Sequence, residues 1–238
     1  MKLTALIAGI LAMSTLAISQ PQNGGLVEVT GDDLFIPVGF DDNDEAVLVV
    51  DGFLPSGCYR LTRPEVDFDQ DNGVVTVRPM ARWFDIPCIE ARIPYNFEVR
   101  LGVMPMGEYE VRIAGTDVSG ELYVEEAANA GPDDYLYAPV DAVTVERLVG
   151  SQTHVGLLEG RFTNSCMRFD NVRVIHTEKT VQVLPIIEMD EGQDCLQGIF
   201  PFKQSFIIPA DVEEGRHLLH VRSLNGRDVN KLFTITRN

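Results

Sequence analysis

Runs in which apolar and polar residues alternate recur along most of the chain. The clearest is YNFEVRL at 95–101, where Tyr95, Phe97, Val99 and Leu101 fall on one face of a strand with a period of two. Comparable runs return at intervals of about 8 to 12 residues with turn residues between them, which is typical of a β-sandwich. Beyond the N-terminal segment no stretch has a convincing helical period, so the sequence predicts an all-β fold.

The predicted strands form two series that match each other in order. In each series the third and fourth segments are expected to pair as a hairpin. The first segment contains a proline, Pro37 or Pro139, which cannot donate to a sheet ladder and so favours an edge strand or a bulge. The first series comprises 32–38, 46–50, 58–68, 73–79, 95–101, 107–113 and 121–124, and the second comprises 133–140, 154–158, 166–175, 180–185, 202–208, 215–221 and 231–235.

The two series are copies of one ancestral domain. Eight residues of the first copy recur in the second at an offset of about 107 residues, which indicates a duplication. Between the copies, the sequence AANAGPDD at 127–134 contains a Gly-Pro pair that ends a strand, so we predict domains over 20–128 and 129–238. The shared residues are Gly52, Cys58, Val75, Val77, Pro79, Cys88, Pro94 and Gly107, matched by Gly160, Cys166, Val181, Val183, Pro185, Cys195, Pro201 and Gly215.

Each copy contains two cysteines, at matching places. Because an ancestral single copy could pair only its own two, the duplication selects Cys58 with Cys88 and Cys166 with Cys195. Each bridge would close a loop of about 30 residues, for which chain entropy predicts roughly 3 to 4 kcal/mol of stabilisation. We therefore expect structural disulfides and an oxidising compartment, while the lack of close pairs such as C-x-x-C argues against a metal site.

The N-terminus has the pattern of a secretory signal peptide over 1–19. Lys2 supplies a positive charge, 3–16 is apolar or small, and Ala17-Ile18-Ser19 places small residues before a cut at Gln20. The apolar run is shorter than the roughly 18 residues that suggest a membrane span, and no comparable run follows. We expect an exported protein, periplasmic or extracellular, with no membrane insertion after cleavage.

The chain is strongly acidic, with a formal net charge of -17 from 19 basic and 36 acidic residues. Such a surface repels nucleic acid phosphates and anionic membranes, and the sequence contains no basic cluster that would offset this. Nucleic acid is therefore not an expected partner. The excess acidity favours solubility and is compatible with a cationic partner, although we favour the interpretation that it forms a solvated surface with no partner implied.

One segment of the first copy resembles the turn and strand that carry the tyrosine corner of immunoglobulin-like and fibronectin-like sandwiches. It reads GEYEVRI at 107–113, with Tyr109 at the corner position. The second copy has His217 at that place, and antibody domains put a cysteine two residues after the tyrosine, where this chain has Val111. The resemblance implies an immunoglobulin-like or fibronectin-like fold and no particular activity.

Asp67, Asp69 and Asp71 form the strongest candidate for a ligand site. Aspartates at alternate positions open many Ca²⁺ loops, but Asn72 stands where an EF-hand needs glycine and Arg78 stands where it needs its closing glutamate. Asn72-Gly73 between two alternating runs is also a strong hairpin turn, which we favour over the Ca²⁺ site. A second acidic run, DDNDE at 41–45, is expected to be a solvated loop.

All four histidines, His154, His176, His217 and His220, lie in the second copy. His217 and His220 are three residues apart on a predicted strand, so they should point to opposite faces and not share an ion. The sequence lacks H-E-x-x-H, G-x-S-x-G and a glycine-rich phosphate loop, and its cysteines are assigned to bridges. We expect structural or surface roles for these histidines and no enzymatic activity.

The segment Arg82-Trp83-Phe84 is the largest chemical difference between the copies, since the second has IIEMDEGQD, without aromatics, in its place. An exposed tryptophan beside an arginine is typical of interface hot spots. The competing interpretation, which we favour for Trp83 itself, is that it packs over the Cys58–Cys88 bridge as core.

The sequence as a whole predicts two tandem disulfide-stabilised β-sandwiches in a non-enzymatic exported protein. We expect it to bind a protein or envelope component, with Arg82, Trp83 and Phe84 as first suspects and no cofactor. The alternative is a Ca²⁺-dependent adhesion or carbohydrate-binding module that uses Asp67, Asp69 and Asp71. The oligomeric state is left open.

Overall fold

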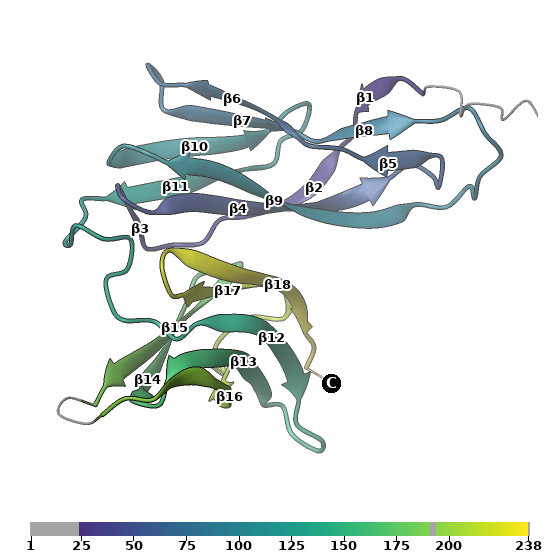
Figure 1. Cartoon of the computed structure of the whole chain (residues 1–238). Helices are drawn as coiled ribbons and strands as arrows, with labels where there is room; N and C mark the ends of the chain where they lie inside the picture. Colours follow the sequence, from purple (N-terminus) through teal and green to yellow (C-terminus); the bar gives the residue numbers. More distant parts are fainter. Residues whose placement is uncertain (1–23, 191–193, 238) are drawn as a thin grey trace, which may run out of the picture.

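The computed structural model describes residues 24–190 and 194–237, and every regular element in these residues is a β-strand (Figure 1). The strands build two sandwiches, the first above the second in the view of Figure 1, connected by residues 126–139. The prediction of two tandem β-sandwiches is confirmed. The signal peptide predicted over 1–19 lies outside the described residues. Among those that are described, there is no helix that could span a membrane.

The first sandwich contains eleven strands in three sheets. A three-stranded sheet, β2-β4-β9, faces a five-stranded sheet, β3-β11-β10-β7-β6, and a small sheet, β1-β8-β5, extends one end. The strands are β1 (Leu26–Glu28), β2 (Gly31–Phe35), β3 (Phe40–Asp41), β4 (Glu45–Leu54), β5 (Tyr59–Leu61), β6 (Glu65–Asp69), β7 (Val74–Arg78), β8 (Met80–Trp83), β9 (Ile93–Val103), β10 (Gly107–Ile113) and β11 (Ser119–Glu125).

The second sandwich repeats this plan with seven strands in two sheets. The sheet β12-β13-β16 corresponds to β2-β4-β9, and the sheet β14-β15-β17-β18 corresponds to the larger sheet of the first sandwich. The two copies share one parallel pair at the same place, β7 with β10 and β15 with β17, and the first copy has a second parallel pair between β11 and β3. The strands are β12 (Val140–Arg147), β13 (His154–Asn164), β14 (Met167–His176), β15 (Thr180–Met189), β16 (Gln197–Ile207), β17 (Gly215–Ser223) and β18 (Arg227–Ile235).

The first copy has four strands more than the seven predicted: β1 and β3 are short strands that the sequence does not predict, and the other two arise where prolines divide a strand. The expected strand at 58–68 divides into β5 and β6 around Pro64, and β7 and β8 divide at Pro79, because proline has no N–H to donate to the ladder. The two halves then enter different sheets. In the second copy 133–139 is not a strand, contrary to the predicted segment, and its Tyr137 makes only an isolated bridge.

Each sandwich has its own apolar core, to which the duplicated glycines contribute. A Cβ at Gly52 would lie 2.8 Å from the Thr30 carbonyl oxygen, against the ring of Tyr95. A Cβ at Gly160 would meet the corresponding Pro139 carbonyl and the ring of Phe202. The recurrence of these glycines therefore follows from the close approach of a backbone and an aromatic ring in both copies. The two cores contain, among others, Leu48, Val77, Val111 and Leu122 in the first copy and Leu158, Val183, Leu219 and Val221 in the second.

The two sandwiches pack against each other through an apolar centre. Phe35 of β2 and Val49 of β4 are buried against Leu218 of β17 and Leu232 of β18. The outer face of β2-β4-β9 is thus covered by the outer face of β17 and β18, as Figure 1 shows. The ring of Phe40 adds an edge contact to His220, with ring centroids 5.8 Å apart.

Charged pairs surround this apolar centre, mostly with the acid on the first sandwich. Arg216 forms two bonds to Asp51, of 2.6 and 3.0 Å, and Lys179 lies 2.8 Å from Asp33. Burial raises the pKa of Asp51, and its hydrogen bond and charge contact with Arg216 oppose that rise. Some of the chain's excess acidic residues therefore form ion pairs that hold the second sandwich against the first.

Candidate functional site

Four large apolar side chains are exposed together at the end of the first sandwich that carries its disulfide. Leu26, Trp83, Ile86 and Ile89 expose between 39 and 71% of their surface, and we call this set the apolar tip. Leu26 stands on β1 opposite Arg82, and Trp83 ends β8 opposite Tyr59 of β5. Since neighbouring residues of a strand alternate, Leu26 and Trp83 project from opposite faces of the sheet β1-β8-β5 at the same end of the sandwich. Ile86 and Ile89 follow in the loop that leads to Cys88 and then to β9.

This loop is held in place by covalent and hydrogen bonds. Cys58 is bonded to Cys88, and Cys166 to Cys195 in the second sandwich, which are the pairs expected from the duplication. The backbone N–H of Gly57 donates to the Ile89 carbonyl at 2.9 Å, and that of Phe84 donates to the Cys58 carbonyl at 3.0 Å. The two disulfides indicate an oxidising, extracellular type of environment.

The three residues singled out from the sequence differ in their surroundings. Trp83 is 39% exposed, so the interpretation that it is a core residue is wrong. Arg82 is exposed on the neighbouring position of β8, and its guanidinium donates to the Gly24 carbonyl at 3.4 Å. Phe84 is half-buried.

Sequence reasoning missed Leu26, Ile86 and Ile89 as members of this surface. Each is an isolated apolar residue without periodicity, and only the sheet register and the disulfide bring them to the end of the sandwich that carries Trp83. One signal was present in the sequence: Ile86 and Ile89 flank Pro87 and Cys88 closely, so the predicted bridge had to present them on a constrained loop.

The acidic hairpin of the first copy forms the predicted turn. Strands β6 and β7 pair from Glu65 and Arg78 to Asp69 and Val74. Asp67 is bonded to the guanidinium of Arg78, and Asp69 accepts the side-chain amide of Asn72 at 2.7 Å. That bond lowers the pKa of Asp69. Across residues 24–190 and 194–237, no cluster of three or more metal-ligating His, Cys, Asp or Glu residues occurs.

The second acidic run, 41–45, is not the solvated loop that the sequence predicts. Asp44 is 2% exposed and accepts two hydrogen bonds, of 2.8 and 2.5 Å, from the guanidinium of Arg222 in the second sandwich. Burial raises the pKa of Asp41, partly offset by a hydrogen bond from the Asn43 backbone. Adjacent acids are usually solvated, and nothing local in the sequence shows that an arginine 178 residues away covers this one.

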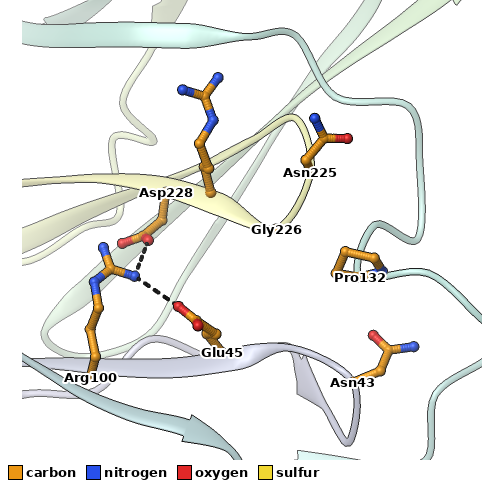
Figure 2. A pocket seen from close by; sticks show the side chains of 8 residues that line it. Asn43, Glu45, Arg100, Pro132, Asn225, Gly226 and Asp228 are labelled. Carbon is orange, nitrogen blue, oxygen red and sulfur yellow. Dashed lines mark ion pairs between the residues drawn. The ribbon is translucent and has the colours of Figure 1, made fainter.

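A cavity of about 420 Å³ lies beside this pair, between the sandwiches (Figure 2). Arg100 of β9 enters it and lies 3.0 Å from Asp228 of β18 and 3.6 Å from Glu45. A third carboxylate, Glu98, is 3.3 Å away. Three acids neutralise Arg100, so this group serves the contact between the sandwiches and is not available to an anionic ligand. Arg227 also lines the cavity, and its Nε donates to the Leu224 carbonyl at 3.3 Å.

The histidines of the second copy have separate structural contacts. His217 and His220 of β17 are buried, and Nε2 of His217 bonds the Glu213 carbonyl at 2.9 Å, whereas Nδ1 of His220 bonds Asn230 Oδ1 at 2.8 Å. Nε2 of His176 lies 3.3 Å from Asp211. His154 is buried in β13. Each histidine thus has its own surroundings, and none belongs to a cluster of three or more metal-ligating residues in the described part of the chain.

The family described as the ORF11 beta-sandwich domain matches residues 48–124. The matched segment begins within β4 and ends within β11, and it includes both Cys58 and Cys88 as well as Trp83. It covers less than half of the chain, so the likeness is to the first sandwich and concerns its fold. No match was found among curated proteins or solved structures.

Proposed function

We propose that this protein is a non-enzymatic exported binding module, periplasmic or extracellular, that contacts a protein partner of the cell envelope or exterior through its apolar tip. The observation that carries the proposal is the exposure of Leu26, Trp83, Ile86 and Ile89 at one end of the first sandwich. Large exposed apolar groups that are concentrated in one region of a soluble protein mark interaction sites.

The rigid backbone of the tip favours a role in binding. The Cys58–Cys88 bridge and the bond from Gly57 to Ile89 fix the backbone before any partner arrives, so docking would cost little conformational entropy. Trp83 beside Arg82 supplies the residue types that dominate interface energies. A rigid end with apolar groups on both faces suits a partner with an apolar groove that encloses it.

The position of the second sandwich is compatible with this role, because it docks on the first sandwich away from the tip. Its docking through Leu218, Arg216 and Arg222 covers the face of β2-β4-β9 and leaves the tip at the far end of β1, β5 and β8 (Figure 1). The tip is therefore held away from the contact between the two sandwiches, where it is open to a partner.

The proposal is tested by capture of envelope proteins from the producing cells on immobilised protein. Wild type is compared with Trp83→Ala and Ile89→Ser, and with Tyr123→Ser as the matched control. Tyr123 is 46% exposed on β11, on the outer face of the larger sheet. We expect both tip variants to lose the same captured protein while the control retains it, with melting temperatures unchanged. Equal capture by all four proteins would refute the proposal.

A further inference from the structure

The outer face of β12-β13-β16 presents a second apolar surface, at the opposite side of the molecule from the first sandwich (Figure 1). Ile207 of β16 is 65% exposed and is paired with half-buried Val155 of β13. Leu157 continues the row, and the exposed side chains of Leu148 and Val149 in the turn after β12 extend it. A cavity of about 330 Å³ on this face is lined by Leu148, Val149, Val155 and Leu157.

The duplication shows what this face does in the other copy. Gly52 corresponds to Gly160, so Val47 and Val49 of β4 correspond to Val155 and Leu157 of β13. In the first sandwich Val49 is buried beneath Leu218 and Leu232 of the second. The same sheet face is therefore a docking face in one copy and faces solvent, with its apolar pair retained, in the other.

A head-to-tail chain of copies is disfavoured by the residues that would meet this face. The first sandwich has Glu110 paired with Glu121 where the second has Leu218 paired with Leu232. Docking the face of β12-β13-β16 on the first sandwich of another copy would press Val155 and Leu157 against these two carboxylates, at a cost in desolvation. An interface that repeats without closing is thus not built into the chain.

Charge favours contact between two identical faces. Strands β12, β13 and β16 carry three acidic and three basic residues, although the whole chain has 36 acidic against 19 basic residues and a net charge of -17. Two such acidic molecules repel each other over most of their surfaces, and this balanced sheet is a face that can approach its own copy without that penalty. The charged residues are Asp141, Glu146 and Glu159 with Arg147, Arg161 and Lys203.

We propose that the face of β12-β13-β16 binds the same face of a second copy of this chain, giving a two-fold dimer with Val155, Leu157 and Ile207 at its centre. Strands of about ten residues, at roughly 3.4 Å per residue and 4.8 Å between strands, give the face an area of roughly 500 Å². This is below the roughly 800 Å² per partner of a standard stable interface, so the dimer dissociates on dilution. The apolar tips remain free in this dimer, which would present two of them.

Sedimentation velocity over about 1 to 300 µM protein tests the dimer, since this range suits an interface of that size. Ile207→Lys places a charge at the proposed centre on an exposed position, and Tyr123→Lys is the matched control on the first sandwich. We expect wild type and the control to shift from monomer to dimer with concentration, while Ile207→Lys stays monomeric with an unchanged melting temperature.

Three results would overturn the proposal: a wild-type monomer at every concentration, a dimer that persists in Ile207→Lys, or species that grow beyond the dimer. The variant Trp83→Ala separates this inference from the proposed function. If it abolishes the dimer, the second copy binds the apolar tip and not the sheet; if the dimer persists, the two surfaces act independently.

Discussion

Arg222 and Asp44 form a bidentate ion pair across the contact between the two sandwiches, with side chains that are 6 and 2% exposed. A third hydrogen bond runs from the same guanidinium to the Pro132 carbonyl at 2.9 Å, in the segment that connects the sandwiches. Burial lowers the pKa of Arg222, but the hydrogen bond and charge of Asp44 outweigh this and leave the pKa raised. Arg222 thus bonds the first sandwich through Asp44 and the connecting segment through Pro132.

Replacing Asp44 with alanine should destabilise the protein strongly. The change leaves the guanidinium of Arg222 buried without its carboxylate, which costs about 3 to 5 kcal/mol in comparable buried pairs. Urea denaturation gives the free energy of unfolding, and Asp71→Ala is the control, because Asp71 is an exposed aspartate in the β6–β7 turn. Similar losses in the two variants would show that the pair does not hold the contact.

The two sandwiches can be predicted from the sequence, because the features that produce them are visible in it. Alternation in β9 and β10 gives the strands, and the duplicated glycines and cysteines give the repeat and its bridges. The contact between the copies does not follow, because it joins residues such as Asp44 and Arg222 whose neighbours in the sequence give no hint of burial. The apolar tip is missed for the same reason: isolated residues become a surface only through register and a disulfide.

Lowering the pH should reduce the free energy of unfolding because of His220. Its Nδ1 donates to Asn230 Oδ1, and its buried Nε2 has no hydrogen-bond partner among the described residues, so an added proton would find no acceptor. Burial lowers the pKa of His220 below its ordinary value of 6.5, against the opposing effects of Asn230 and Asp228. The unfolded chain therefore takes up a proton near pH 6.5 that the folded protein excludes, and stability present above that pH is lost as the pH falls below it.

The free energy of unfolding, measured from pH 7.5 to 5.5, checks this sign. Wild type should lose up to about 1.4 kcal/mol per pH unit below 6.5 from this histidine. His220→Asn keeps an N–H donor toward Asn230 without a titrating ring, so its stability should fall less steeply over the same interval. Parallel curves for the two proteins would remove His220 as the cause.

Tyr109 and His217 make the same contact in the two copies. The Tyr109 hydroxyl donates to the Pro105 carbonyl at 2.7 Å, and Nε2 of His217 bonds the Glu213 carbonyl at 2.9 Å, in each case four residues upstream. The departure seen in the sequence is thus a change of residue that keeps the contact. Tyr109→Phe and His217→Phe should each cost about 1 kcal/mol. Tyr123→Phe, on an exposed tyrosine, should cost nothing measurable; no loss in the first two would show that the contact is dispensable.

Calcium should not stabilise the protein. Asp67 is already bonded to Arg78 and Asp69 to Asn72, so their carboxylates would have to abandon these partners to surround a cation. Thermal unfolding with and without Ca²⁺ at about millimolar concentration, the range of weak extracellular sites, should give the same midpoint. A rise that disappears in Asp69→Asn would instead support the adhesion or carbohydrate-binding alternative.

Photo-crosslinking in the producing cells tests the apolar tip most directly. A benzophenone amino acid is placed at position 86 or 89 in the tip, or at position 123 on the outer face of the larger sheet, and the cells are irradiated. The account predicts one discrete adduct of the protein from positions 86 and 89 and none from 123. Adducts from 123 alone, or no adduct from either tip position, would contradict it.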